Sequence, residues 1–423
     1  MDQFNYNNGT LFIEKTSIED LTQELATPFY LYSNEEICNN YHKLNNALGN
    51  LNAQICYAVK ANSNQAILTL LASMGSGADV VSEGELKRAL SAGIAANKIV
   101  FSGVGKTSQE ITFALKSGIF QFNVESEPEL KHISELCVLL NLTANIAIRI
   151  NPDIAADTHE KISTGKAENK FGIEHTRTLE IYAYAAKLPG IKVQGIDVHI
   201  GSQINDLTPF EATFKRLAEL VIKLKKAGHD INVIDIGGGL GVTYNPEQDK
   251  KYDLQHYANL IHQYLAPLNC KIIVEPGRSI LASAGVLVTK INYIKTTPTK
   301  QFLILDAGMN DFARPSLYDA YHQIMPIKQH STGETSYDIV GPVCETGDTF
   351  AKSRNMPIVA QGDYLVIKDT GAYGAAMSST YNTRPLIREV MVKGLQYSTI
   401  RAPQTIDDII NQDKLPEWLI DED

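Results

Sequence analysis

A lysine at the end of an apolar strand pattern is the first residue of this chain whose position could support chemistry. The apolar run 55–59 ends directly before Lys60. Burying an amine there is costly unless the amine is paired or bonded covalently, and a desolvated lysine can act as a nucleophile. The alternative is a lysine whose amine reaches solvent at the rim of a sheet. This segment alone leaves both interpretations open.

Two glycine-rich turns could bind an anion. Residues 237–241 contain four glycines in five positions, and residues 275–278 place Glu275 and Gly277 beside Arg278. Backbone N–H groups in such turns can converge on a phosphate, and an arginine adds positive charge. The alternatives are a tight turn at the first segment and a structural ion pair between Glu275 and Arg278.

A histidine and a cysteine lie in two further segments that could contact a ligand. His199 is followed closely by Ser202, and the glycine between them lets the backbone approach a ligand while the serine adds a hydroxyl. Cys344 and Glu345 place a thiol beside a carboxylate. A hydrogen-bonded core histidine and a small core cysteine followed by a turn are the alternatives.

Two tyrosines and an arginine complete the set of candidate side chains. Tyr373 lies between small residues, which could expose its phenol to a ligand. Arg314 and Tyr318 add a cation and a second phenol four residues apart, and their alternative is a surface turn. Each of these signals is weak alone, so the elements that position them decide whether they form one site.

Short β-branched runs recur between residues 50 and 280, each followed by a helical pattern. The runs are 55–59, 78–81, 99–101, 120–124, 145–150, 193–199, 233–236 and 271–274. Strands that alternate with helices predict parallel βαβ units. Eight such units predict an α/β fold with a (β/α)8 TIM-like barrel, whose functional residues lie at the carboxyl ends of the strands. An open doubly wound sheet is the alternative.

Beyond about residue 285, strand patterns follow one another without long helices between them. This predicts a mostly antiparallel β domain built from the C-terminal part and the N-terminal segment. We expect the barrel domain to span 28–285 and the β domain to comprise 1–27 and 286–423. The strand candidates of the β domain are 10–13, 291–295, 301–306, 325–328, 337–341 and 363–367.

Composition excludes several classes of function. The chain has 423 residues, and its 38 Lys+Arg against 48 Asp+Glu give a net charge of −10. An acidic protein is a poor partner for nucleic acid or an anionic membrane. No apolar run approaches about 20 residues, and the first residues carry no secretory pattern. The five cysteines form no C-x-x-C pair, so we expect a cytoplasmic protein without disulfides or a metal site.

The candidate residues converge on one cofactor chemistry. A lysine that can bond to an aldehyde, a phosphate cradle and a carboxylate that faces a ring nitrogen are together what pyridoxal 5'-phosphate requires. The phosphate cradle is supported by the barrel prediction, because many barrels bind phosphate at the loops after strands seven and eight. A phosphosugar isomerase would use the same loops, but it would not need Lys60, His199 and Cys344 together.

The sequence resembles the diaminopimelate decarboxylases, which belong to the fold type III (alanine-racemase-like) group of pyridoxal-phosphate enzymes. The resemblance runs from about residue 26 to about residue 385. It implies decarboxylation of meso-2,6-diaminoheptanedioate to L-lysine and CO2, the last step of lysine biosynthesis. The motifs that carry it are 57–62, 162–165 with 169–172, 199–203, 237–241, 275–278, 344–348 and 371–374.

The resemblance implies how the cofactor is held. Lys60 matches the lysine that bonds covalently to the cofactor aldehyde, His199 matches the residue that stacks on the pyridine ring, and Glu275 matches the partner of the ring nitrogen. Tyr373 matches a further cofactor contact. The residues that match the phosphate cradle are Ser202, Gly239, Gly277 and Arg278.

The resemblance also implies catalytic roles for Lys60, His199 and Cys344, with Cys344 as the general acid that protonates Cα after CO2 leaves. The substrate carries an amino-acid group at each end, so one end reacts while the other is recognised. Glu345 would receive the distal ammonium, and Arg278, Arg314 and Tyr318 would hold the distal carboxylate, since arginine pairs with carboxylates through two bonds. The implied substrate contacts are Arg278, Arg314, Tyr318, Glu345 and Tyr373.

In the family that the sequence resembles, the cysteine and glutamate at positions 344 and 345 reach into the partner subunit's site. The resemblance therefore implies a homodimer with shared active sites and an amino-acid substrate, while the acidic composition and the lack of a long apolar run argue against a nucleic-acid or membrane partner. A related decarboxylase of ornithine, arginine or carboxynorspermidine, a non-catalytic regulatory homologue, and a racemase are the alternatives. Arg314 and Glu345 together favour the substrate with two amino-acid groups.

Overall fold

The structure is a computed structural model that describes residues 3–154, 170–329 and 333–419. It divides into two compact units. We call Cys38–Leu281 the barrel unit, and we call Met1–Ile37 with Ala282–Asp423 the β unit. The motif at 162–165 and residue 169 lie outside the described residues.

Eight parallel strands close the barrel unit into a ring. Each strand pairs with the next, and the last pairs again with the first, which confirms the (β/α)8 prediction over an open sheet. The eight runs expected from the sequence correspond to these strands, with ends that differ by at most two residues. The strands are β5 (Ala53–Ala58), β6 (Gly77–Val80), β7 (Ile99–Phe101), β8 (Gln121–Val124), β9 (Ala144–Asn151), β11 (Ile191–Asp197), β12 (Val233–Asp235) and β13 (Lys271–Val274).

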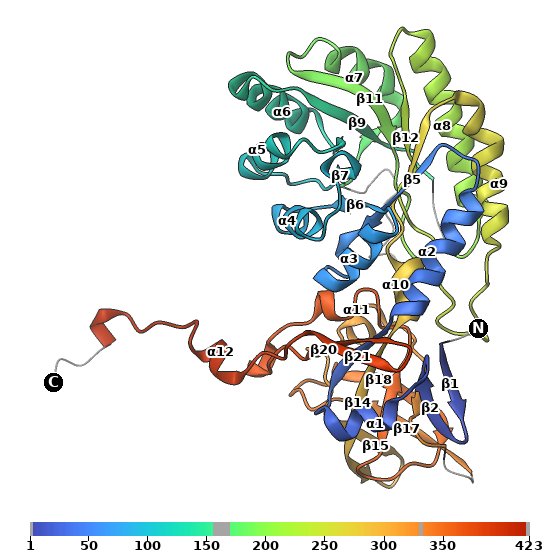
Figure 1. Cartoon of the computed structure of the whole chain (residues 1–423), viewed down its shortest axis with the longest axis vertical. Helices are drawn as coiled ribbons and strands as arrows, with labels where there is room; N and C mark the ends of the chain where they lie inside the picture. The colour runs from blue at the N-terminus through green and yellow to red at the C-terminus, as the bar shows by residue number, and fades with distance from the viewer. Residues whose placement is uncertain (1–2, 155–169, 330–332, 420–423) are drawn as a thin grey trace. The chain divides into compact units, whose positions relative to one another are not determined.

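Helices alternate with the strands, and most of them cover the outside of the ring (Figure 1). Their apolar residues recur every three to four positions, so that α8 buries Phe210, Phe214 and Leu217 on one face. Ser82 caps α4 by accepting from the Glu85 backbone, while the Glu85 carboxylate accepts from the Val81 backbone. The helices are α2 (Asn34–Leu48), α3 (Gln65–Ser73), α4 (Glu83–Ser91), α5 (Ser108–Ser117), α6 (Glu127–Leu140), α7 (Thr178–Ala185), α8 (Thr208–Lys226), α9 (Leu254–Tyr264) and α10 (Arg278–Leu281).

The β unit is built on a mixed sheet in the order β18-β17-β15-β14-β4-β20-β21, to which β19 and β16 add. Most pairs are antiparallel, and the sheet joins N- and C-terminal segments, as expected. Its strands are β4 (Phe29–Ser33), β14 (Gly285–Thr296), β15 (Gln301–Leu305), β16 (Ile324–Pro326), β17 (Glu334–Val340), β18 (Thr349–Pro357), β19 (Tyr364–Ile367), β20 (Arg388–Lys393) and β21 (Gln396–Arg401).

Strand β4 places the division between the units later in the chain than the expected boundary at residue 28. It pairs with β14 on one side and with β20 on the other. All five of its residues are buried, and its Phe29 and Leu31 contribute to one apolar core of the β unit together with residues of β1 (Phe4–Asn7) and β2 (Thr10–Ile13). Residues 28–37 therefore belong to the β unit. Among the described residues, no helix has the length and hydropathy needed to cross a membrane.

Candidate active site

The Lys60 amine lies at the carboxyl end of β5, in the short 3-10 turn η1 (Val59–Ala61). Its Nζ is 3.3 Å from Oδ2 of Asp79 in β6. The Lys60 side chain is 39% exposed, whereas the Asp79 side chain is fully buried. The Asp79 carboxyl group thus anchors the Lys60 amine, which remains accessible. Lys60 is therefore neither fully buried nor simply extended into solvent.

Five buried carboxyl groups lie at the carboxyl ends of the barrel strands: Asp79, Glu125, Asp197, Asp235 and Glu275. Burial raises the pKa of Glu275 well above its usual value, and the charges of Asp235 and Asp79 raise it further. Burial likewise raises the pKa of Asp197, with Asp235 as the strongest neighbouring charge. Such a cluster either keeps protons or recruits a positively charged group.

Asn123 of β8 ties two of these carboxyl groups together. Its side-chain nitrogen lies 3.1 Å from Oδ2 of Asp235 and 3.3 Å from Oε1 of Glu275, and it also contacts the Ser102 hydroxyl at 3.1 Å. Gln121 donates to the Asn123 side-chain oxygen at 2.8 Å, which fixes the orientation of the amide. The nitrogen of Asn123 therefore points toward Glu275.

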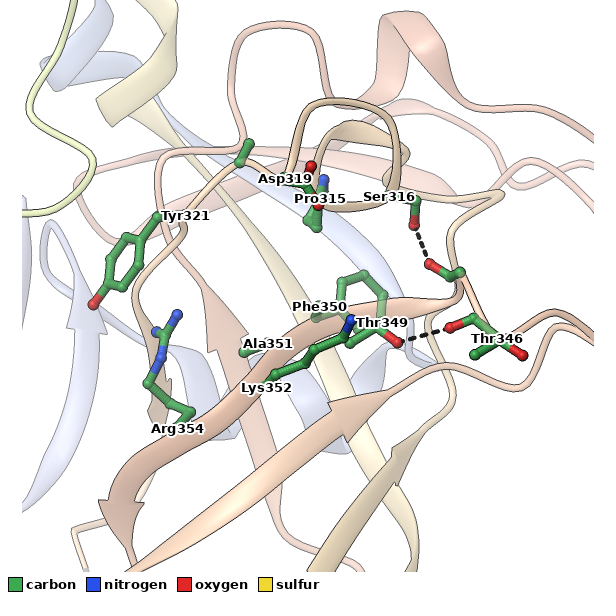
Figure 2. Close-up of a pocket in the computed structure, with 12 residues that line it drawn as sticks. Pro315, Ser316, Asp319, Tyr321, Thr346, Thr349, Phe350, Ala351, Lys352 and Arg354 are labelled. Carbon is green, nitrogen blue, oxygen red and sulfur yellow. Dashed lines mark hydrogen bonds between the residues drawn. The ribbon is translucent and has the colours of Figure 1, made fainter. Parts of the chain in front are cut away.

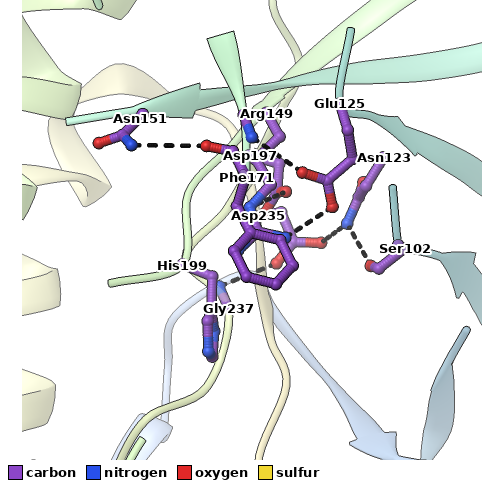
Figure 3. Close-up of polar contacts among 12 residues, drawn as sticks. Ser102, Asn123, Glu125, Arg149, Asn151, Phe171, Asp197, His199, Asp235 and Gly237 are labelled. Atoms are coloured by element: carbon purple, nitrogen blue, oxygen red, sulfur yellow. Dashed lines mark hydrogen bonds and ion pairs between the residues drawn. The ribbon is translucent and has the colours of Figure 1, made fainter. Parts of the chain in front are cut away.

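Arg149 of β9 is the buried cation of the cluster, as Figure 3 shows. It lies 2.7 Å from the Glu125 carboxylate and 3.9 Å from that of Asp197. Its guanidinium also lies over the Phe171 ring, and the Gly172 N–H donates to the second oxygen of Glu125 at 2.9 Å. This ion pair thus connects the barrel end to the segment that begins at residue 170.

His199 follows β11 and is neutral. Burial lowers the pKa of its imidazole well below the usual value, and the positive charges of Arg149 and Lys60 lower it further. The Gly238 N–H donates to Nδ1 at 3.2 Å, so Nδ1 is the acceptor and the ring proton lies on Nε2. Gly237 allows this approach, because a Cβ there would lie 2.7 Å from Nδ1.

The loops after β11, β12 and β13 meet around the residues expected to hold a phosphate. Arg278 Nη2 donates to the Ser202 hydroxyl at 3.0 Å, and Nη1 donates to the Tyr244 hydroxyl at 2.7 Å. Gly239 adopts φ +109°, and its carbonyl accepts from Ile204 at 2.9 Å. A Cβ on Gly239 would lie 2.7 Å from the Gly201 carbonyl oxygen, so the turn requires glycine.

Gly239→Ala is expected to weaken cofactor binding about tenfold or more, because the added methyl group clashes with backbone and the conformation is strained. Gly228→Ala is the matched control: Gly228 also has positive φ, but a Cβ there meets nothing within 4 Å. The measurement is the dissociation constant of pyridoxal 5'-phosphate by titration. Equal affinities in the two variants would remove this turn from the cofactor site.

In the β unit, the loop at 344–348 is bonded to the short helix α11 (Arg314–Tyr318). The Ser316 hydroxyl donates to the Gly347 carbonyl at 2.6 Å, which Figure 2 shows beside a pocket. Asp348 is buried and accepts from the Val343 and Met309 backbones, both at 2.6 Å. These bonds hold the loop that carries the cysteine beside the helix that carries Arg314.

Cys344 and Glu345 are both exposed at the tip of this loop. The Cys344 backbone donates to Asn382 at 3.3 Å, and the Tyr381 hydroxyl donates to the Glu345 carboxylate. This bond and the charge of Glu345 raise the pKa of Tyr381. The thiol and carboxylate therefore share a surface of the β unit with a protonated phenol.

Tyr373 has φ +57°, and the following glycine lies so close to the Thr370 carbonyl that a Cβ would be 2.3 Å away. The tight turn at 371–374 thus fixes the Tyr373 backbone.

The structure brings one set of expected residues together at the barrel end: Lys60, His199, Ser202, Gly239, Glu275, Gly277 and Arg278. The others, Arg314, Tyr318, Cys344, Glu345 and Tyr373, lie in the β unit.

Comparison with known proteins decides the family. Residues 34–282 match the family described as pyridoxal-dependent decarboxylase, pyridoxal binding domain. A diaminopimelate decarboxylase of Zymomonas mobilis is 46% identical over 422 residues, covering 99% of this chain and 100% of the relative. The chain belongs to the diaminopimelate decarboxylase family. The resemblance found in the sequence motifs is thereby confirmed.

Solved structures of the family agree over nearly the whole chain. The Helicobacter pylori diaminopimelate decarboxylase, complexed with L-lysine, has a TM-score of 0.90 at 44% identity, covering 93% of this chain and 98% of that chain. The M. jannaschii enzyme, also in complex with L-lysine, has a TM-score of 0.94 at 36% identity, covering 99% of both chains. Both units of this chain therefore have counterparts in the family.

The barrel end fits pyridoxal 5'-phosphate, the cofactor of this decarboxylase family. The cluster of buried carboxyl groups suits a protonated pyridine nitrogen, and Oδ1 of Asp79 and Oδ1 of Asp197 are buried without a hydrogen-bond partner among the described residues. Arg278 and the glycine turn suit a phosphate. The accessible Lys60 amine suits an aldehyde.

Sequence reasoning missed several residues that lie at the barrel end or contact the expected residues there. Arg149 stands in the apolar strand β9, and a charged residue in such a run was the signal that could have drawn attention to it. Asn123 stands in the same way within β8. Tyr244, which binds Arg278, lies in a loop without a motif.

Proposed function

We propose that this chain decarboxylates meso-2,6-diaminoheptanedioate to L-lysine and CO2, the last step of lysine biosynthesis. The observation that carries the proposal is the identity of 46% to a diaminopimelate decarboxylase over 99% of this chain. Relatives of known structure are complexed with L-lysine, which is the proposed product.

The proposed cofactor contacts lie at the barrel end. Lys60 would hold pyridoxal 5'-phosphate until the substrate amine takes its place, and the cofactor would then supply the electron sink for the breaking Cα–carboxylate bond. Glu275 holds a proton at the ring nitrogen, and its position among carboxyl groups supports this role, because they favour a proton or a cation beside it. The neutral His199 ring packs against the pyridine face. The phosphate is bound by Ser202, Gly239, Gly277 and Arg278.

The proposed substrate contacts recognise the end that does not react. Arg314 and Tyr318, with Arg278, hold the distal carboxylate, and Glu345 accepts from the distal ammonium. Tyr373 contacts both cofactor and substrate. Arg314 is buried and therefore largely dehydrated, which strengthens its attraction for a carboxylate. An amino acid without the distal carboxylate would leave this guanidinium without its ligand.

The proposed proton donor is the Cys344 thiol, which delivers its proton to Cα once CO2 has left. Its exposed position on the 344–348 loop supports a role toward a second subunit. We therefore propose a homodimer in which Cys344 and Glu345 of each subunit complete the partner's site. The five free cysteines of the chain support a reducing, cytoplasmic location.

Mixing two inactive variants tests the shared site. In a heterodimer of Lys60→Ala and Cys344→Ala subunits, one of the two sites receives both intact residues, and half of the dimers in an equal mixture are heterodimers. We expect the mixture to recover about a quarter of wild-type activity. The two variants are unfolded, mixed and refolded together so that heterodimers can form. Each variant refolded alone is the control. A mixture as inactive as its components would place Cys344 in its own subunit's site.

An activity panel tests the substrate. Purified protein with pyridoxal 5'-phosphate should release CO2 from meso-2,6-diaminoheptanedioate at a kcat/KM at least about 10²-fold above that for ornithine, arginine or carboxynorspermidine, since each of these lacks the distal carboxylate that Arg314 is proposed to bind. A preference for any of the other three amino acids would overturn the proposed substrate while leaving the decarboxylase class intact.

A further inference from the structure

We infer that His322 is a positioning residue for Arg314 and thereby sets the affinity of the site for ligands that carry the distal carboxylate. The inference rests on the proposed role of Arg314 in holding that carboxylate. It adds a residue of the β unit that neither the sequence motifs nor the proposed contacts include.

A buried contact joins the two side chains. Arg314 is 5% exposed and His322 is 0% exposed. Arg314 Nη1 lies 2.8 Å from His322 Nε2, and His322 Nδ1 lies 2.7 Å from the Lys368 carbonyl oxygen. The Phe312 ring packs edge-on against the imidazole, with centroids 4.7 Å apart. The imidazole is therefore held on both nitrogens and on its ring.

The chemistry of the partners fixes which nitrogen carries the proton. A guanidinium only donates hydrogen bonds, so Nε2 of His322 accepts from Arg314. A carbonyl oxygen only accepts, so Nδ1 carries the hydrogen and donates to Lys368. The ring is thus neutral, since a second proton on Nε2 would set two donors and two positive charges against each other in a buried place.

The rest of the β unit fixes His322 before any ligand arrives. Arg354 of β18 donates to the His322 carbonyl at 2.9 Å, and its guanidinium lies 4.1 Å from the centroid of the Tyr321 ring. Figure 2 shows Arg354 beside Tyr321 at the wall of the pocket. Lys368, which binds the ring, follows β19. The imidazole therefore links Arg314 of α11, a helix of five residues, to the strands of the sheet and holds its side chain in place.

This contact matters because a guanidinium is a rigid planar fork. Engaging Nη1 with His322 fixes the plane of the fork and so the direction of its other N–H groups, which bidentate carboxylate binding requires. Without the Nε2 acceptor, the buried Nη1 loses a hydrogen-bond partner. The Arg314 side chain then adopts another conformation, and its N–H groups no longer point toward the carboxylate of the ligand.

Two substitutions test whether the Nε2 acceptor of His322, and not the rest of the side chain, positions Arg314. His322→Gln places an amide oxygen near the position of Nε2 and can still accept from Arg314. His322→Asn places its amide near Nδ1, where it can serve Lys368 but is too short to reach Arg314. His229→Asn is the matched control, because His229 also packs edge-on against an aromatic ring, that of Tyr182 in the barrel unit.

The readouts use ligands with and without the carboxylate. For His322→Asn we expect the KM of meso-2,6-diaminoheptanedioate and the Kd of L-lysine to rise about tenfold or more, with kcat within about threefold of wild type. The Kd of 1,5-diaminopentane, which has two amines and no carboxylate, should not change. His322→Gln and His229→Asn should stay within about threefold of wild type on every measure.

A failure of the proposed function would be seen in the wild-type protein, whereas a failure of the inference would be seen in the His322 variants. A wild-type chain that releases no CO2 from the substrate would overturn the proposed function. Equal L-lysine affinity in wild type and His322→Asn, a lower kcat at unchanged KM, or equal weakening of 1,5-diaminopentane would overturn the inference. Should His322→Asn fail to fold, a tenfold loss of L-lysine affinity in His322→Gln would also overturn it, because that variant keeps the acceptor.

Discussion

Lys60→Ala is expected to abolish decarboxylation and the visible absorbance of the covalently held cofactor together. The rate should fall by at least about 10³-fold, because removing the residue that bonds to the reactive group removes the route through which catalysis proceeds. Lys106 cannot take its place: its side chain is 1% exposed, and its Nζ is already bound to the Gly103 and Asn123 carbonyls and the Glu129 carboxylate.

The measurements are CO2 release and an absorbance spectrum of purified protein after excess cofactor has been removed. Lys87→Ala is the control, since Lys87 is exposed and its contacts, with Glu83 on α4 and with the Phe113 ring on α5, lie away from the barrel end. That variant should keep both activity and spectrum. A Lys60→Ala protein that still releases CO2 at more than a few per cent of the wild-type rate would refute the role of Lys60.

Cys344→Ala should lower kcat by about 10² to 10⁴-fold while the cofactor stays bound, because a general acid contributes on that scale. Cys344→Ser should be impaired as well, since a hydroxyl is a much weaker acid than a thiol. The control is Cys38→Ala, a half-buried cysteine in α2. Measured by CO2 release and absorbance, a normal kcat in Cys344→Ala would require another proton donor.

The barrel could be predicted because its strands carry a strong local signal. Most residues of these strands are buried, so that a run such as 271–274 is almost wholly apolar and β-branched. The expected domain boundary at residue 28 differs from the division between the two units, because β4 has an equally apolar pattern. Nothing in that pattern tells which sheet β4 joins. Long-range pairing, which decides this, is absent from local sequence.

The site was predictable where residues occur in motifs and unpredictable where a contact is made only by folding. Lys60, His199 and Glu275 end apolar runs and therefore stand out. Arg149 and Asn123 lie inside such runs, and their partners come from other strands. His322 has no local signal at all, because its meaning comes from Arg314 and the Lys368 carbonyl, which the sheet of the β unit brings to it.

Chemical reduction followed by peptide mass spectrometry tests the central claim most directly. Borohydride reduces the carbon–nitrogen double bond between the cofactor and a lysine, so that the cofactor remains attached through digestion. The account predicts the added mass on the peptide that contains Lys60 and on no other lysine peptide. Attachment at a different lysine, or an unmodified Lys60 in a protein that is active with pyridoxal 5'-phosphate, would contradict it.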